Sequence, residues 1–143
     1  MLHQIFADLK DEMENVTRPE PKDYDAEAAW FQMLFENNEG LKSLEKAGIR
    51  TFTSDYVLYW FDYLGGYDVI LAQFGWNNSY IQDIALVRGA ARLQGKSWGA
   101  IITWKYTEPP YLASGEEIYN QMCTAYEAGA EYVVIFIVFN KTN

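Results

Sequence analysis

The residues best suited to chemistry in this chain lie in one stretch, WGAIITWKYTEPPY, at residues 98–111. Its first part is apolar, as expected for a strand that is covered on both faces. Its second part holds four side chains that can bind or react with a ligand: Trp104, Lys105, Tyr106 and Glu108. Two prolines follow, and they end strand pairing because proline lacks an amide hydrogen. Active and ligand-binding sites of barrels and open α/β sheets lie at the carboxyl ends of the strands. The stretch therefore predicts either such a site or a strand end with exposed polar residues and an aromatic cap on the core.

The composition limits the classes of function. The 143 residues are the size of one domain, and the net charge of −9 argues against binding to nucleic acid or to an anionic membrane. One cysteine and one histidine are too few for a usual zinc site or a histidine-dependent triad, so no metal site and no cofactor is predicted. The N-terminal stretch MLHQIFADLKDEMEN lacks the features of a signal peptide, and no apolar run approaches membrane-spanning length. A cytoplasmic protein is expected.

From residue 49 onward, strand and helix patterns alternate. Four runs predict strands at residues 49–55, 67–77, 98–104 and 131–139. Two of the intervening helices begin at capping boxes, at Ser79 and Ser114. The alternation predicts an α/β fold of alternating β/α units with a four-stranded parallel sheet, a half or partial TIM-type barrel, in a single domain of residues 1–143. Residues 1–48 are expected to form a helical N-terminal segment.

An open four-stranded sheet of the flavodoxin kind is the alternative fold. The chain contains neither G-x-G-x-x-G nor G-x-x-x-x-G-K-[ST], so nothing in it predicts nucleotide binding. The last predicted strand, EYVVIFIVF, is the most apolar segment of the chain. It is expected to be a central strand, covered on both faces.

Helical spacing assigns some side chains to faces. Asp25 is expected to be the N-cap of the helix in AAWFQMLFENN. Asp62 and Asp83 are expected on solvent-facing sides of their helices. The helix after Ser114 is expected to turn these side chains inward: Ile118, Met122, Cys123 and Tyr126.

The carboxyl ends of parallel strands share one rim of the sheet, and polar and aromatic residues gather there in the sequence. In chain order they are Ser54, Asp55, Gln73, Trp76, Asn77, Trp104, Lys105, Tyr106, Glu108 and Asn140. Aromatic rings can cover the C–H side of a sugar ring, while amides and carboxylates pair with its hydroxyl groups. Glycoside hydrolysis typically needs two carboxyl groups, and the pair available on this rim is Asp55 with Glu108.

Each of these residues also has a structural interpretation. Asp55 precedes a predicted helix and can serve as its N-cap alone. Trp76 and Trp104 can plug the end of a barrel, and Glu108 can be a loop residue without a task. Gln73 is an amide in an apolar strand, so it is expected to be hydrogen-bonded and to face the barrel interior near the rim.

Four segments together resemble a known type of protein. They are TFTSDYVLYWFDYLGGYD, ILAQFGWN, RGAARLQGKSWGAIITWKYTEPPY and SGEEIYNQMCTAYEAGAEYVVIF. They look like the C-terminal half of a (β/α)8-barrel glycoside-hydrolase-like protein, over residues 40–140. The resemblance implies a sugar-binding cleft at the rim and a nucleophilic carboxylate from a late strand, a position that Glu108 matches loosely. Gln73 stands where such a family could place a carboxylate, and residues 1–48 contain no counterpart of the strand that carries the acid/base residue.

Two classes of function follow from these observations. The first is a glycoside-hydrolase-like carbohydrate-active protein, with Glu108 and Asp55 as its catalytic carboxylates. Its sugar-binding residues would be Gln73, Trp76, Asn77, Trp104, Lys105 and Tyr106. The alternative is a non-catalytic carbohydrate-binding or self-associating half-barrel module. A half barrel exposes two strand edges and an apolar face. A homodimer or the helical N-terminal segment would cover them, and the homodimer is preferred.

Overall fold

The computed structural model describes residues 23–75, 78–106, 109 and 111–137. These residues form an α/β fold with one four-stranded sheet, in which all three strand pairings are parallel and the strand order is β1-β2-β3-β4. The strands are β1 (Phe52–Asp55), β2 (Val69–Phe74), β3 (Ser97–Lys105) and β4 (Tyr132–Ile137). The predicted fold class is confirmed.

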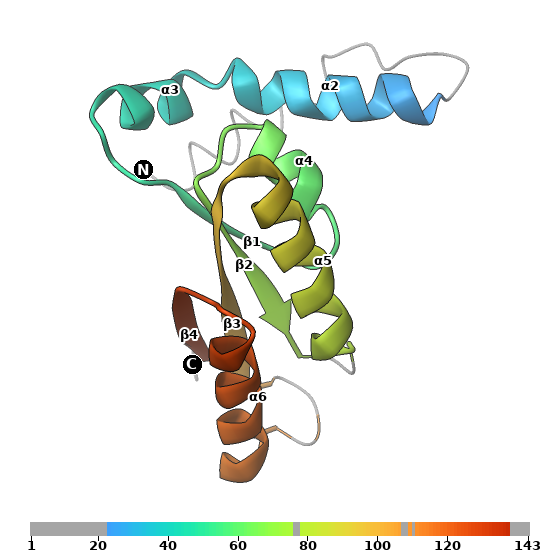
Figure 1. Cartoon of the computed structure of the whole chain (residues 1–143), viewed down its shortest axis with the longest axis vertical. Coiled ribbons are helices and arrows are strands. Elements are labelled where there is room, and N and C mark those ends of the chain that lie inside the picture. Colours follow the sequence, from blue (N-terminus) through green and yellow to red (C-terminus); the bar gives the residue numbers. More distant parts are fainter. Residues whose placement is uncertain (1–22, 76–77, 107–108, 110, 138–143) are drawn as a thin grey trace, which may run out of the picture.

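The helices that follow the strands cover one face of the sheet (Figure 1). They are α4 (Tyr59–Leu64), α5 (Tyr80–Gln94) and α6 (Gly115–Glu127). Crossovers between neighbouring parallel strands are right-handed, so a sequential strand order places every crossover helix on the same side. Neighbouring units of a (β/α)8 barrel are arranged in this way. The Ser79 and Ser114 hydroxyls cap α5 and α6 as expected, and Gly95 closes α5 with a left-handed φ of 64°.

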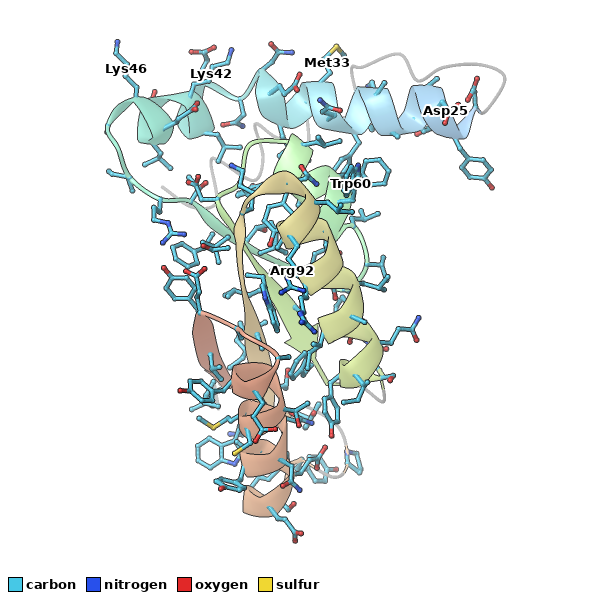
Figure 2. All side chains as sticks on the ribbon, viewed as in Figure 1. Asp25, Met33, Lys42, Lys46, Trp60 and Arg92 are labelled. Carbon is cyan, nitrogen blue, oxygen red and sulfur yellow. The ribbon has the colours of Figure 1, made fainter. Side chains whose placement is uncertain are left out.

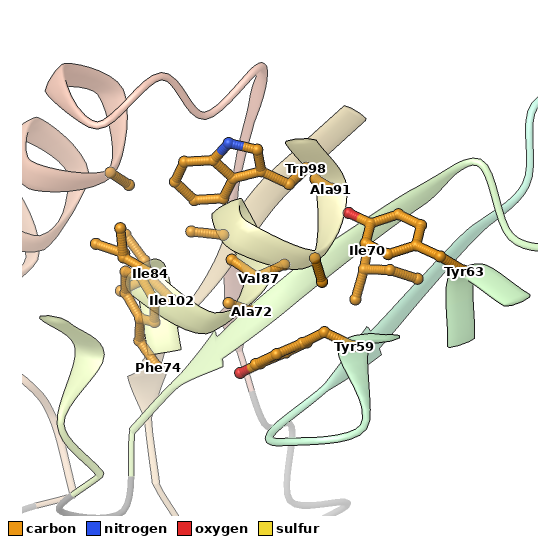
Figure 3. Packing of buried hydrophobic residues seen from close by; sticks show 13 residues of the cluster. Tyr59, Tyr63, Ile70, Ala72, Phe74, Ile84, Val87, Ala91, Trp98 and Ile102 are labelled. Carbon is orange, nitrogen blue, oxygen red and sulfur yellow. The ribbon is translucent and has the colours of Figure 1, made fainter. Parts of the chain in front are cut away.

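The hydrophobic core lies between the sheet and these helices (Figure 3). Alternate residues of β2 and β3 point into it: Ile70, Ala72, Phe74, Trp98, Ala100 and Ile102. On the helix side, Tyr59 and Tyr63 of α4 and Val87 of α5 pack against them. Because side chains alternate along a strand, the remaining strand residues point to the opposite face.

We call this opposite face the helix-free face; its side chains point away from α4, α5 and α6. Side chains from β1 and from the residues just before it reach across this face. The rings of Phe52 in β1 and Tyr132 in β4 meet edge to face, with centroids 5.0 Å apart. Arg50 donates hydrogen bonds to the Tyr132 hydroxyl at 2.7 Å and to Ser97 Oγ at 2.9 Å. Gly99 makes room beneath, since a Cβ there would lie 2.5 Å from the Tyr132 carbonyl oxygen.

The N-terminal helices are α2 (Tyr24–Glu36) and α3 (Glu39–Lys46). They lie at the end of the sheet where the strands begin (Figure 1). Phe35 of α2 packs on the Tyr67 ring at 5.9 Å, just before β2, whereas Met33 points away from the sheet (Figure 2). Residues 23–47 therefore do not cover the helix-free face. The N-cap of α2 is Asp23, whose carboxylate accepts the N–H of Asp25, so the prediction of Asp25 as the cap was wrong.

Two expectations about the C-terminal third were also wrong. Among the described strands β4 lies at the edge of the sheet and not in its centre, and Val134, Ile135 and Phe136 are all exposed. An apolar composition shows that a strand needs cover but does not show its place in the sheet. The inward residues of α6 include Ile118, Gln121 and Ala125, whereas Met122 and Tyr126 are exposed and Cys123 is only partly buried.

Candidate functional site

Asp55 ends β1 at the rim formed by the carboxyl ends of the strands. Its Oδ1 atom accepts hydrogen bonds from the backbone N–H groups of Val57 at 2.7 Å and Leu58 at 2.8 Å. These bonds stabilise the turn between β1 and α4, but the N-cap of α4 is Leu58 and no side chain caps this helix, so the expectation of Asp55 as its N-cap was wrong. The two bonds also fix the position of the Asp55 carboxylate at the rim.

The ends of β2 and β3 lie close together. Gly75 follows β2 with a φ of 147°, and a Cβ there would lie 3.1 Å from Thr103 Oγ1 and 3.2 Å from the Tyr106 hydroxyl. Tyr106, just beyond β3, is thus folded back over the end of β2. Gln73 lies on the helix-free face beside Ile101, its partner in the β2–β3 register, and is partly buried. Gln73 therefore faces the side expected from the sequence.

The connection from β3 to α6 is held at its base by a short antiparallel pairing. The N–H of Tyr106 donates to the Tyr111 carbonyl oxygen and the N–H of Ala113 donates to the Trp104 carbonyl oxygen, both at 2.9 Å. Lys105 bridges Leu112 in the same antiparallel pairing. These bonds determine where the chain leaves and re-enters the sheet.

The same connection carries backbone irregularities that are characteristic of functional sites. The register between β3 and β4 shifts between Thr103 and Lys105, at Trp104, and bulges of this kind redirect side chains next to sites. Tyr111 has a φ of 62°, a strained conformation for an aromatic residue and the only positive φ of a non-glycine residue in the described ranges. Trp104 and Tyr111 are exposed, with 41% and 57% of their surface accessible.

Sequence reasoning missed a group of buried acidic and phenolic side chains behind this rim. Asp83, in the first turn of α5, is buried next to Tyr59 of α4. Burial raises the pKa of Asp83, and the nearby Tyr59 hydroxyl lowers it by less. The two groups do not meet the geometry of a hydrogen bond, since the Tyr59 hydroxyl and Asp83 Oδ2 have no such partner in the described part of the chain. Burial, together with the charges of Tyr106 and Asp83, also raises the pKa of Tyr56.

Asp62 of α4 is buried as well, with only 4% of its surface exposed, and its Oδ2 atom has no hydrogen-bond partner in the described residues. Burial, helped by the charge of Asp55, raises its pKa from 3.8 to about 7. The prediction that Asp62 and Asp83 face solvent was therefore wrong. The signal that could have found Asp62 is its spacing, because it lies three residues after Tyr59 and one before Tyr63, on the buried face of a six-residue helix.

The structure brings together some of the predicted site residues. The Tyr106 hydroxyl lies close to Gly75, two residues after Gln73 at the end of β2, and Asp55 is the last residue of the neighbouring β1. Four members of the predicted rim lie outside the described residues: Trp76, Asn77, Glu108 and Asn140. Within the described ranges, no cluster of three or more His, Cys, Asp or Glu side chains is arranged to hold a metal ion. None of the helices described has the length and apolarity that crossing a membrane requires.

Comparisons of the chain with protein-family models, curated proteins and solved structures gave no significant match.

Proposed function

We propose that this chain is a carbohydrate-active protein of the glycoside-hydrolase type, which binds a sugar at the carboxyl ends of β1, β2 and β3. The observation that carries the proposal is the connection between β3 and α6. Its base is fixed by backbone hydrogen bonds, its backbone is strained at Tyr111, and it leaves the rings of Trp104 and Tyr111 exposed. Exposed aromatic rings beside polar groups suit a sugar, whose ring has apolar C–H surfaces edged by hydroxyl groups.

The proposed roles of the other residues follow from their chemistry. The Gln73 amide, the Tyr106 hydroxyl and the Lys105 ammonium group would hydrogen-bond the sugar hydroxyls, and Trp76 and Asn77 would bind the same sugar. Glu108 would be the principal catalytic carboxylate, with Asp55 as the second. Carboxyl groups about 5–5.5 Å apart would give retention of configuration, and groups about 6.5–9.5 Å apart would give inversion.

The test of binding compares two aromatic-to-alanine variants. A panel of oligosaccharides is first screened against the wild type, and the affinity for the best ligand is then measured by calorimetry. Trp104→Ala should weaken binding on the order of tenfold, because it removes one stacking ring. Tyr126→Ala is the matched control, since Tyr126 is exposed near the end of α6, away from the rim. Equal affinity of the two variants, or no sugar bound by the wild type, would contradict the proposal.

The test of catalysis uses the same ligand. Glu108→Gln should abolish most of its hydrolysis, because a positioned carboxyl group contributes on the order of 10² to 10⁴ in rate. It should leave the thermal midpoint and the sugar affinity nearly unchanged. A variant that retains most of the activity, or that unfolds, would show that Glu108 is a structural loop residue.

The second candidate is a non-catalytic sugar-binding module in the cytoplasm. Two features favour it: backbone N–H groups bind Asp55 Oδ1, and position 73 carries an amide where the family that the chain resembles could place a carboxylate. Binding of a sugar without any turnover, by wild type and Glu108→Gln alike, would decide for the module.

A further inference from the structure

The two edges of the sheet are complementary to each other. β1 pairs with β2 and β4 pairs with β3, so each edge strand leaves one side unpaired among the described strands, and all four strands run in the same direction. A two-fold axis parallel to the strands would place β4 of one chain beside β1 of a second chain, again in parallel. The same operation joins the other two edges. We propose that two copies of this chain close in this way into one eight-stranded parallel barrel, with the helices outside.

The stagger of the strands agrees with such a barrel. Ser54 of β1 is in register with Leu71, Gly99 and Tyr132. The middle of β1, between Thr53 and Ser54, is thus level with residues 131–132, whereas the middle of β4 lies at residues 134–135, three residues further on. In a barrel of eight strands with a shear of 8, the register shifts by about one residue from each strand to the next. From β1 to β4 there are three such steps, which accounts for a shift of three residues. We call the pairing of β4 of one chain with β1 of the other the seam. A further shift of one residue at each seam would set Thr53 opposite Ile135 of the second chain.

Side chains from the two edges of the sheet also meet over the helix-free face, which would become the interior of the barrel. Neighbouring strands lie about 4.8 Å apart, so β1 and β4 would be separated by about 14 Å in a flat sheet. The ring of Phe52 nevertheless contacts that of Tyr132, and Arg50 reaches the Tyr132 hydroxyl. Side chains from the two edges thus converge over the helix-free face, as they do inside a barrel, where the interior is filled by side chains.

Exposure on the helix-free face is greatest at the edge strands. Val69 and Leu71 of the central β2 are buried there, whereas Val134 and Phe136 of β4 keep 41% and 39% of their surface exposed, and Phe52 of β1 is exposed too. β4 moreover lacks charged residues, proline and glycine, the features that usually protect an edge strand from pairing. A second copy would cover these residues in both chains.

The distribution of charge favours this face for contact between two copies of the chain. The chain has 20 acidic residues and a net charge of −9, so two copies repel each other across most of their surface. The helix-free face carries no acidic residue on β1–β4. Its members there are Phe52, Ser54, Val69, Leu71, Gln73, Ser97, Gly99, Ile101, Thr103, Tyr132, Val134 and Phe136. The inference does not depend on sugar binding, although closure would bring the rims of both copies to the same end of the barrel.

The first experiment measures molar mass by size-exclusion chromatography with light scattering. The wild type should have twice the 16.5 kDa mass of one chain. Val134→Lys should give monomers, because it places an ammonium group inside the barrel. Leu86→Lys should remain dimeric, since Leu86 lies on α5 with a similar exposure of 46%. A monomeric wild type would overturn the proposal and would mean that the helix-free face is covered within one chain or left open.

The second experiment identifies the seam without a disruptive substitution. In a Cys123→Ser background, chains carrying Thr53→Cys are mixed with chains carrying Ile135→Cys and treated with a short bis-maleimide. The mixture should crosslink, whereas each variant alone should not. Crosslinking of Ile135→Cys alone would indicate antiparallel pairing of two β4 edges, and it would overturn the barrel. A dimer without crosslinks in the mixture would likewise refute the proposed seam.

Discussion

Asp62 provides the sharpest test of the packing between α4 and its neighbours. Its carboxyl group is buried beside Tyr59 and Tyr63 of its own helix, with one oxygen unpartnered, and Asp55 is the charged group that acts on it. Burial and the Asp55 charge raise its pKa from 3.8 to about 7. The folded protein therefore favours the protonated form of Asp62 over a pH range in which the unfolded chain has already lost the proton.

The sign of the pH dependence follows from this difference. Below about pH 4, Asp62 is protonated in both states and contributes no penalty. Between about pH 4 and pH 7 the folded state binds more protons than the unfolded state, so the free energy of unfolding falls as the pH rises. Above about pH 7 the penalty is complete. A difference of about three pKa units corresponds to about 4 kcal/mol, an order-of-magnitude figure that is comparable with the whole stability of many domains.

The Asp62→Asn variant removes this penalty because its amide does not ionise. Urea denaturation at a series of pH values should show the variant to be more stable than the wild type at pH 8, by a few kcal/mol, and the difference should shrink towards pH 4. Asp25→Asn is the control, since it makes the same substitution at an exposed position of α2. A constant difference between Asp62→Asn and the wild type from pH 4 to pH 8 would refute the reasoning.

Two further predictions concern the sheet. Gly99→Ala should lower the thermal midpoint by an amount equivalent to roughly 1–3 kcal/mol, because its Cβ would lie 2.5 Å from the Tyr132 carbonyl oxygen; an unchanged midpoint would mean that β3 and β4 are further apart. Asp68→Asn should destabilise the protein at pH 7, since hydrogen bonds from Thr51 and the charge of Lys96 lower the pKa of Asp68 in the folded state. That loss should disappear as the pH falls below the folded pKa, and a loss that persists in acid would contradict this account.

The sequence predicted the features that depend on local interactions. The caps at Ser79, Ser114 and Gly95 are each determined within a few residues, and the alternation of strands and helices leaves few topologies for a parallel sheet. Part of the rim was also predictable, because the residues that follow an apolar run indicate where a parallel strand ends. Gln73 on the helix-free face is an example.

The features that the sequence did not predict depend on contacts made far along the chain. The position of β4 at the edge follows from the strand order, which no property of Tyr132–Ile137 specifies. Asp62 and Asp83 were expected on the solvent-facing sides of their helices, yet α4 is only six residues long and position 62 lies on its buried face. The strain at Tyr111 has no signature in the residue type, since it arises from the pairing that closes the loop.

The contact between Arg50 and Tyr132 has a consequence for how the chain folds. Each of the four described strands pairs only with its neighbours in sequence, so the sheet can grow one unit at a time from β1 as the chain lengthens. The hydrogen bond between Arg50 and Tyr132 joins residues 82 positions apart, and it can form only when β4 is in place. We expect it to form late, and its loss to speed unfolding more than it slows folding, because native contacts absent from the transition state affect mainly the unfolding rate.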